Sequence, residues 1–301
     1  MDYKRIIKRK EVRFAMLRML SFVPDGLMVR LQYYIKLRRW PNLKHPTRFS
    51  EKLQCYKLRY HNPLLGQCVD KYTVRQYVQS KGLGDILNEL YGVYDRAEDI
   101  PFEHLPNRFV IKTTDGLGAG VNVMICTDKT CLDITATVKK VNSWLNMKLM
   151  NPGREWAYSQ INQSRIIVEK YIDSAGNKDG LIDYKFFCFD GEPHYMYIIR
   201  GRKLGEGAFL GIYDIKYNKL NVYRCDEKRA IEPQPIPENY ERMVEIARQL
   251  SSDFPHVRVD LYNVEGKIIF GELTFYDGSG YMSYDPDSFD IEMGRLFTTY
   301  K

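Results

Sequence analysis

Two acids and an arginine alternate along a predicted β-hairpin near the end of the sequence. Residues 258–275 read RVDLYNVEGKIIFGELTF, in which a central glycine marks the turn between two strand-like runs. Antiparallel pairing around that turn places Asp260 opposite Glu272, and Arg258 opposite Thr274, to within one residue of register. Opposed residues have Cβ atoms roughly 4.5 to 5.5 Å apart, so the two carboxylates would repel each other unless a positive charge lay between them. The pattern therefore indicates either a cation site or a solvent-facing hairpin on which Arg258 is a surface counter-charge.

A glycine-rich loop follows a lysine in the middle of the sequence. Residues 112–122 read KTTDGLGAGVN, so that the strand FVIK brings Lys112 to the mouth of the loop. Glycines allow backbone N–H groups to approach a polyanion closely, and a lysine beside them supplies a charge for phosphate. The spacing is neither that of a P-loop nor that of a dinucleotide-binding fingerprint, and an ordinary hairpin loop would have the same composition. The three glycines of interest are Gly116, Gly118 and Gly120.

Two further segments carry charges at the start of a helix or inside a strand. Residues 166–172, IIVEKYI, have the composition of a buried strand interrupted by Glu169 and Lys170. The backbone of such an extended edge can hydrogen-bond an adenine ring, although the same pattern is typical of an ordinary strand. Lys71, preceded by Asp70, opens a segment with helical periodicity. Neither segment is specific by itself.

The rest of the chain must position these residues, and it alternates between helical and hairpin segments in blocks. Apolar periodicity predicts helices over residues 70–81, 134–150 and 237–254. Strand–turn–strand patterns predict hairpins over residues 183–202 and 209–225. Such blocks favour an α+β architecture over a regularly wound parallel sheet.

Composition is that of a packed globular protein. The chain has 301 residues, of which 44% are hydrophobic, and no apolar run approaches the roughly 20 residues of a membrane-spanning helix. The N-terminus lacks the apolar core of a signal peptide, so we expect a cytoplasmic protein. The cysteines show no CxxC pairs and the histidines no metal-ligand spacing, although His256 stands two residues before Arg258. We expect reduced, buried cysteines, namely Cys55, Cys68, Cys126, Cys131, Cys188 and Cys225.

Positive charge is concentrated at the N-terminus. Residues 1–45 contain 12 Lys or Arg and 3 acids, a local charge of +9 in a chain whose total is +7. Apolar residues recur among these charges at helical spacing, which suits a helical pair that packs on the domain or lies on an anionic membrane surface. No nucleic-acid-binding motif accompanies the charge, so we expect no nucleic-acid partner. Peripheral contact with the inner membrane surface through this segment is one interpretation.

In order and type, these residues resemble the ATP-grasp superfamily, and within it the TupA-like ATP-grasp family of bacterial surface-polysaccharide loci. The resemblance covers roughly residues 40 to 285, and the ordered set of motifs is far more specific than any one of them. The motifs are FSEKLQCYKLRYHNPL, VDKYTVRQYV, RFVIKTTDGLGAG, IIVEKYI, DYKFFCFDGEP, VRVDLY and FGELTFYDGSG.

The resemblance implies a role for each residue in binding ATP and Mg²⁺. Phosphates would be held by Lys71 and Lys112 and covered by the loop of Gly116, Gly118 and Gly120, while adenine would be read by the hinge strand Glu169, Lys170, Tyr171 and Ile172. The implied metal ligands are Asp260 and Glu272, and Arg258 would face the transferred phosphate. Thr274 stands where the superfamily usually has Asn, so it is a substitute ligand and puts the number of metal ions in question. Lys185 is a further phosphate or acceptor candidate, or else a surface lysine.

The implied fold is an α+β ATP-grasp fold that holds nucleotide between two α+β subdomains with antiparallel sheets, preceded by N-terminal helices. Its parts would be a basic helical segment over 1–45, a helical or α+β part over 46–100, a small subdomain over 101–175 with the glycine loop and hinge, and a large subdomain over 176–301 with the metal-binding hairpin. Oligomeric state is not indicated.

The implied activity is that of an ATP- and Mg²⁺-dependent ligase. It would activate a carboxylate as an acyl phosphate and join it to an amine, in teichuronopeptide-like capsular or cell-surface polysaccharide biosynthesis. Its partners would be a small-molecule or glycan carboxylate acceptor and an amine donor, with Arg202 and Lys203 as candidate acceptor contacts. Alternatives are an ATP-grasp sugar kinase, a polysaccharide-locus glycosyltransferase with a DxD-like site at Asp285 and Asp287, or nucleotide binding without catalysis.

Overall fold

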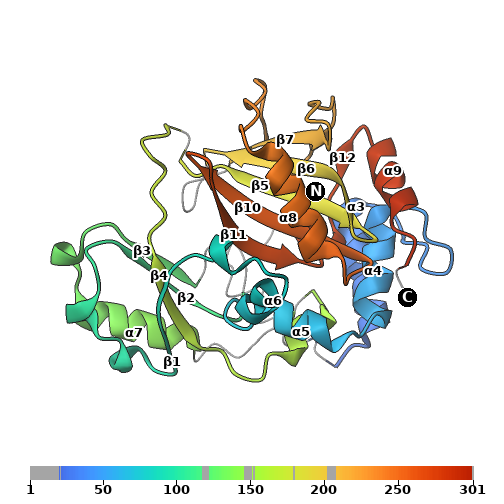
Figure 1. Ribbon diagram of the computed structural model, residues 1–301. Coiled ribbons are helices and arrows are strands. Elements are labelled where there is room, and N and C mark those ends of the chain that lie inside the picture. The colour runs from blue at the N-terminus through green and yellow to red at the C-terminus, as the bar shows by residue number, and fades with distance from the viewer. Residues whose placement is uncertain are drawn as a thin grey trace.

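Two sheets of unequal size dominate the computed structural model, which describes residues 20, 22–116, 122–145, 151, 153–178, 180–201 and 208–299. The large sheet has the strand order β11-β10-β5-β6-β7-β9, and the small sheet the order β1-β4-β2-β3 (Figure 1). Neighbouring strands are antiparallel except for β7 and β9. Helices and mainly antiparallel sheets together confirm the α+β class expected from the sequence.

The large sheet is built from segments of the second half of the chain. Its strands are β5 (Asp183–Phe189), β6 (Glu192–Arg200), β7 (Phe209–Asp214), β9 (Lys228–Arg229), β10 (His256–Val264) and β11 (Lys267–Thr274). Strand β5, near the centre of the sheet, is buried along its whole length. A two-stranded sheet of β8 (Tyr223–Arg224) and β12 (Tyr284–Asp285) lies beside it.

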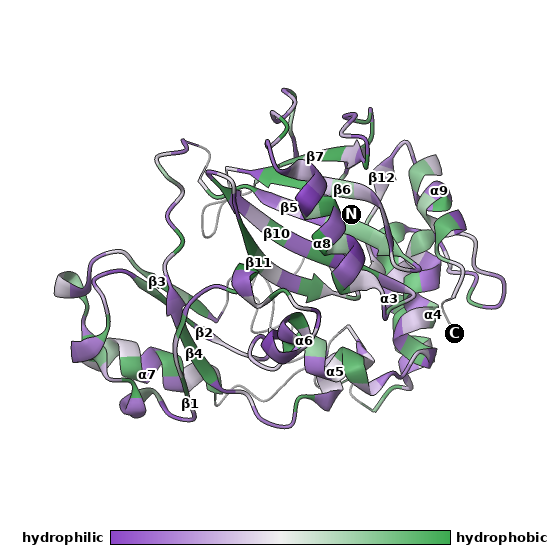
Figure 2. Cartoon of the chain, viewed as in Figure 1, coloured by the Kyte–Doolittle hydropathy of each residue, from purple (hydrophilic) through white to green (hydrophobic). Residues whose placement is uncertain are grey.

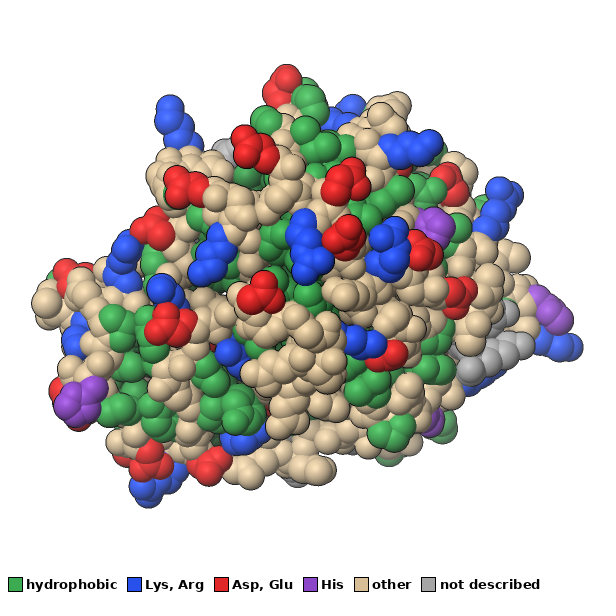
Figure 3. Space-filling view, in the orientation of Figure 1, with side chains coloured by type: hydrophobic (Ala, Val, Ile, Leu, Met, Phe, Trp, Pro, Cys, Tyr) green, Lys and Arg blue, Asp and Glu red, His purple; other side chains and the backbone are tan. Residues whose placement is uncertain are grey.

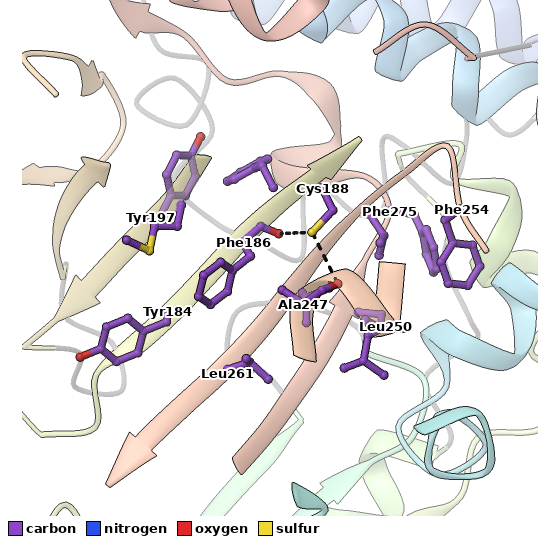
Figure 4. Packing of buried hydrophobic residues seen from close by; sticks show 14 of the residues in the cluster. Tyr184, Phe186, Cys188, Tyr197, Ala247, Leu250, Phe254, Leu261 and Phe275 are labelled. Carbon is purple, nitrogen blue, oxygen red and sulfur yellow. Dashed lines mark hydrogen bonds between the residues drawn. The ribbon is translucent and has the colours of Figure 1, made fainter. Parts of the chain in front are cut away.

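Helix α8 (Tyr240–Ser251) covers one face of the large sheet. Hydrophobic and hydrophilic residues alternate along α8 in Figure 2, as expected for a helix that buries one side and exposes the other. Figure 4 shows this packing. The side chain of Cys188 on β5 points toward α8, and its sulfur lies 3.9 Å from the carbonyl oxygen of Ala247. The apolar side chains Val257, Val259 and Leu261 of β10 face the same core.

The opposite face of the large sheet is covered only in part. Helix α4 (Phe49–Arg59) and helix α9 (Ser288–Leu296) pack against each other at one end of this face. Helix α3 (Asp25–Leu37) lies beside α4 (Figure 1). Helices α5 (Pro63–Val69) and α6 (Val74–Ser80) lead the chain toward the small sheet. The middle of the face is left for polar side chains.

The small sheet has a separate core. Its strands are β1 (Leu90–Tyr94), β2 (Phe109–Thr113), β3 (Val123–Cys126) and β4 (Ile166–Lys170), and helix α7 (Ile134–Leu145) packs against β2. Buried side chains of these elements form a cluster distinct from the main one. Residues 171–182 connect β4 to β5, so one covalent crossover joins the two sheets.

Several sequence-based boundaries and one hairpin are wrong. The helix expected from residue 70 begins at Val74, because Asp70 accepts hydrogen bonds from the backbone of Tyr72 and Thr73 (both 2.8 Å) and stays outside it. The hairpin expected over 209–225 is reduced to an isolated bridge between Tyr213 and Lys219. Its second half instead supplies β8, which pairs with β12. Among the described residues, no helix has the length and apolar character needed to cross a membrane.

Candidate functional site

The hairpin of β10 and β11 has the register that its sequence predicts. Asp260 pairs with Glu272, and Arg258 pairs with Thr274. A bulge after Asp260 adds one residue, Gly271, to the outer strand. A Cβ atom at that position would lie 3.0 Å from the carbonyl oxygen of Asp260, so glycine makes room for the bulge. The four polar side chains therefore gather on one face of the hairpin, as expected.

Arg258 provides the positive charge between the two acids. Its guanidinium makes a bidentate contact with Asp260, with both N–O distances 2.7 Å. The same group lies 3.4 Å from a carboxylate oxygen of Glu272 and donates to the hydroxyl of Thr274 at 3.0 Å. Arg258 is only 7% exposed. Arg258 thus supplies the counter-charge, and the alternative of a solvent-facing hairpin is wrong for this residue because it is buried.

Lys185 makes the second cation contact of Asp260. It lies opposite Asp260 on the neighbouring strand β5, and its ammonium group donates to the carboxylate oxygen Oδ2. Burial by itself would raise the pKa of Asp260, but the charges of Arg258 and Lys185 hold that pKa below its ordinary value. Lys185 is 6% exposed, so its alternative assignment as a surface lysine is wrong.

Glu272 differs from Asp260 in its access to solvent. Its side chain is 48% exposed, whereas that of Asp260 is 3% exposed. One carboxylate oxygen, Oε1, contacts Arg258 and accepts from the hydroxyl of Thr274 at 3.3 Å. The more exposed acid is therefore the one that can take a new ligand without breaking a buried ion pair.

Asp277 completes the buried cluster and was missed by the sequence analysis. It lies just after β11 in a short 3₁₀ segment, Asp277–Gly280, and accepts from the guanidinium of Arg258. Arg224 lies 3.4 Å from its other oxygen. The sequence DGSG is typical of a turn, and Asp277 is its one residue with a charged side chain that could bind a cation.

The small sheet presents its own ion pair toward the same region. Lys112 on β2 lies 2.6 Å from Glu169 on β4, and the guanidinium of Arg75 lies 3.9 Å from the other carboxylate oxygen. The hinge glutamate that the resemblance assigns to adenine thus has two cations beside it in the structure. Arg75 is a further residue that the sequence analysis missed, because only Lys71 was singled out within the motif VDKYTVRQYV.

Lys71 lies at the end of strand β2 of the small sheet. Its backbone N–H donates to the carbonyl of Thr114 at 3.0 Å, which ties it to the end of β2. Burial lowers the pKa of its ammonium group, while Glu272 of the large sheet opposes the shift and Lys112 of the small sheet adds to it. A Cβ added to Gly116 would lie 3.1 Å from the Lys71 ammonium nitrogen. Lys71 and Lys112 are therefore brought together with Gly116 and Glu272.

The remaining hinge and loop residues are less closely grouped. Lys170 is exposed and lies 3.1 Å from Glu89, and Tyr171 is half-buried with the guanidinium of Arg108 over its ring. Ile172 is half-buried beside it. Four predicted residues, Gly118, Gly120, Arg202 and Lys203, lie outside the described residues.

The donor atoms suit Mg²⁺ held together with phosphate rather than in an all-protein cage. Across the described ranges, no group of three His, Cys, Asp or Glu side chains could hold a metal ion. Mg²⁺ commonly binds through one or two carboxylates plus substrate phosphates and water. Glu272 and Thr274 can supply oxygens at once, whereas Asp260 would first have to release Arg258 or Lys185.

Histidines and cysteines play no part in this cluster. His256 is fully buried among aromatic rings, and burial lowers its pKa to about 4. Its Nδ1 lies 2.9 Å from the carbonyl oxygen of Cys188, so it is a neutral structural histidine, as expected. The cysteines are free, but the expectation that all are buried is wrong for Cys131 and Cys225, which are exposed.

A family model described as TupA-like ATPgrasp matches residues 51–298. This range includes the large-sheet cluster, the small-sheet ion pair and Lys71. No curated protein matches the chain.

Among solved structures, D-alanine–D-alanine ligase from Bacillus anthracis is 20% identical, with a TM-score of 0.44 over 69% of this chain and 57% of that one. A second structure of this ligase, complexed with ATP, is 18% identical, with a TM-score of 0.43 over 69% and 55% of the chains. L-amino acid ligase from Bacillus licheniformis is 14% identical, with a TM-score of 0.47 over 98% and 63%. The chain matches only about 55 to 63% of the length of these enzymes.

Proposed function

Because the chain belongs to the TupA-like ATP-grasp family, we propose that it is an ATP- and Mg²⁺-dependent ligase that activates a carboxylate as an acyl phosphate and joins it to an amine. The observation that carries this proposal is the buried cluster of Arg258, Lys185 and Asp260 beside the exposed carboxylate of Glu272. Lys71, which lies against Gly116, is near enough for the charges of Glu272 and Lys112 to act on it. Cations next to an exposed carboxylate suit a bound Mg-nucleotide.

In the proposed reaction, an oxygen of the substrate carboxylate attacks the γ-phosphorus of ATP and ADP leaves. The nitrogen of the amine then attacks the acyl carbon, phosphate leaves, and the nitrogen gives up a proton to form the amide. Bound Mg²⁺ would neutralise charge on the phosphate oxygens. Arg258 is the catalytic residue that faces the transferred phosphoryl group, with Lys185 contacting phosphate or acceptor.

Nucleotide binding is assigned to residues of the small sheet and to Lys71, which lies between helices α5 and α6. Lys71 and Lys112 bind phosphates, and Gly116, Gly118 and Gly120 close over them. The strand end from Glu169 through Lys170 and Tyr171 to Ile172 reads adenine. Binding of ATP by Lys112 requires it to exchange part of its contact with Glu169, which is 2.6 Å in the structure.

For the metal, Glu272 and Thr274 are the first ligands and Asp260 the third. The half-exposed carboxylate of Glu272 supports this order, since Asp260 is held by two cations. A fixed, preorganised Arg258 next to the metal can stabilise charge on the transferred group without rearranging.

Cell-surface or capsular polysaccharide precursors are the proposed substrates, with an amino acid joined to a uronic acid as one form of the reaction. The family's typical setting supports this choice, as does the family's use of carboxylates. Because the reaction uses ATP, the proposed location of the protein is the cytoplasm.

An ATP-grasp sugar kinase is the second candidate, because it would use the same nucleotide residues. A glycosyltransferase is less well supported. Its DxD-like pair includes Asp287, which is engaged by Arg39 at 2.6 Å and Arg48 at 2.7 Å between helices α3, α4 and α9. That acid stabilises the packing of the helices, and it does not face the cluster.

The test is incubation of the protein with Mg-ATP, uronic-acid acceptors and amino acids, followed by measurement of ADP, free phosphate and product mass. A ligase yields ADP and phosphate together with an amide. With a carboxylate labelled with ¹⁸O, one labelled oxygen appears in phosphate. ADP release with phosphate retained on a sugar would favour the kinase. Unchanged activity in Asp260→Asn and Glu272→Gln would overturn the site assignment.

A further inference from the structure

Helix α3 carries a row of exposed apolar side chains along its outer side. Leu27, Leu31 and Tyr34 stand about one turn apart, and they are 58%, 40% and 39% exposed. Ile35 continues the row at 36% exposure. A helix at the surface of a globular protein normally turns such a stripe toward the core.

Aromatic side chains extend the row beyond both ends of the helix. Trp40 is 62% exposed and stacks on Tyr34, with ring centroids 4.6 Å apart. Phe22 is 81% exposed before the helix begins. Six of the eleven large apolar side chains that are exposed among the described residues fall between positions 22 and 40. Single exposed apolar residues need no explanation, but this concentration does.

The inner side of α3 is fixed, so the row cannot turn inward without unpacking the helix. Met28, Val29 and Tyr33 are buried, and the hydroxyl of Tyr33 hydrogen-bonds that of Ser50 at 2.8 Å. The helix therefore presents its apolar row to the outside as a permanent feature.

Basic residues flank the row. Arg30 and Arg38 are exposed on and just after α3, within the segment 1–45 that carries a charge of +9. On the face shown in Figure 3, by contrast, acidic and basic side chains are interspersed. The surface of α3 thus combines apolar side chains with an excess of positive charge, because its exposed acid, Asp25, is paired with Arg154 at 2.9 Å.

We propose that the outer side of α3, from Phe22 to Trp40, docks the protein on an anionic lipid surface. Leucine, isoleucine and aromatic side chains would enter the boundary between headgroups and acyl chains, and the arginines would contact lipid phosphates. This surface is separate from the β10–β11 cluster, and its docking does not depend on the proposed ligase reaction.

The charge of the α3 surface favours an anionic membrane over the other possible occupants. A second copy of the chain would bring another N-terminal segment of +9 against the first. Residues 1–19 carry 7 basic and 2 acidic residues, so they too have the sign of the α3 surface. Nucleic acid matches the charge but offers no apolar phase for Leu27 and Leu31. An anionic membrane satisfies both properties.

Flotation of the full chain with lipid vesicles tests the proposal. We expect binding to vesicles of phosphatidylcholine with phosphatidylglycerol, and at least about tenfold weaker binding to phosphatidylcholine alone or at high salt. The double variant Leu31→Ser/Tyr34→Ser should lose at least about tenfold in vesicle affinity, since it removes two inserted side chains. Arg30→Glu/Arg38→Glu should do the same without altering the apolar row.

Trp40 reports the contact directly. Its fluorescence should shift to shorter wavelength with anionic vesicles. Trp40→Phe should remove the shift, because Trp144 is buried and the half-buried Trp156 is stacked on His61. As a matched control, Ile231→Ser/Ile236→Ser removes two exposed apolar side chains outside α3 and should leave vesicle binding unchanged. Melting temperature verifies that each variant is folded.

Three outcomes would overturn the proposal. One is equal binding to neutral and anionic vesicles, or none to either. A second is a folded α3 variant that binds as the wild type does. The third is a concentration-dependent dimer in solution that the α3 variants abolish, since the row would then be covered by a second copy.

Discussion

The large and small sheets each place a carboxylate between cations, but water reaches the two groups differently. Arg258 and Asp260 of the large sheet have side chains that are 8% and 3% exposed, and both oxygens of Asp260 are engaged. Lys112 and Glu169 of the small sheet are 22% and 9% exposed. Buried ion pairs lose much of their hydration and depend on every partner, whereas more open pairs can exchange partners at little cost. The first cluster therefore belongs to the fold as much as to the site, and the second is suited to exchanging a carboxylate for a phosphate.

Removing the charge of Asp260 is the strongest way to test this difference. Asp260→Asn should lower the free energy of unfolding by about 3 kcal/mol, because Arg258 and Lys185 would lose their shared partner inside the protein. ATP turnover should fall at least about 100-fold. Denaturant unfolding and an ADP assay measure the two effects.

The matched control is Asp99→Asn, which breaks a bidentate pair of similar geometry with Arg96 at the surface. It should leave stability and turnover unchanged. Equal stability of the two variants would show that burial does not separate the clusters as we argue.

The neutral histidine beside the large-sheet cluster gives the next largest effect. The pKa of His256 is lowered to about 4 from 6.5 because charging it would bury an unpaired ion. Between these values the unfolded state binds more protons, so stability falls as pH falls. The loss should reach about 3 kcal/mol at pH 4.

His256→Gln should show a shallower loss of stability than the wild type between pH 6.5 and 4, in denaturant unfolding followed at several pH values. Comparing slopes avoids the unequal packing of the two side chains. Parallel curves would mean that His256 is not the group responsible.

Lys112→Met sharpens the small-sheet side of the comparison. The KM for ATP should rise about tenfold, since one phosphate contact is lost. Stability should stay within about 1 kcal/mol of the wild type, because the pair with Glu169 is partly open to solvent. Exposed Lys139, on helix α7 beside the small sheet but outside the cluster, gives the control Lys139→Met, which should leave the KM unaltered. A large loss of stability in Lys112→Met, with KM unchanged, would assign the pair to the fold.

Thr274→Val gives the smallest expected effect. The variant keeps the size of the side chain but loses a hydroxyl that Arg258 and Glu272 share. If this oxygen assists the metal, the Mg²⁺ concentration for half-maximal turnover should rise about twofold to fivefold. An unchanged Mg²⁺ requirement would leave Thr274 with a role in orienting Arg258 alone.

Local pattern and order predicted the hairpin well. Its register, its central turn and the gathering of Arg258, Asp260 and Glu272 follow from alternation and turn chemistry, which act over a few residues. The identification of Lys71 and Lys112 as candidates required the order of motifs along the chain, since neither has a specific local signal.

Burial could not be predicted in the same way. The sequence gives no sign that α4 and α9 cover one end of the hairpin face, so a solvent-facing hairpin remained an alternative for Arg258, and Lys185 was left between two interpretations. Asp277 was missed because it enters the cluster from a turn, where acids are common. Helix α6 begins later than periodicity suggests because Asp70 binds the backbone ahead of it.

The bulge at Gly271 reverses which side of the sheet the even-numbered residues of strand β11 face. From Ile268 to Phe270, even-numbered side chains belong to the apolar core, and from Glu272 onward even-numbered side chains join the polar cluster. A methyl group at position 271 would press on the Asp260 backbone. Gly271→Ala would therefore disturb the bulge without changing any charge of the site. Gly271 thus determines which alternate positions of this strand face the candidate site and which face the hydrophobic core.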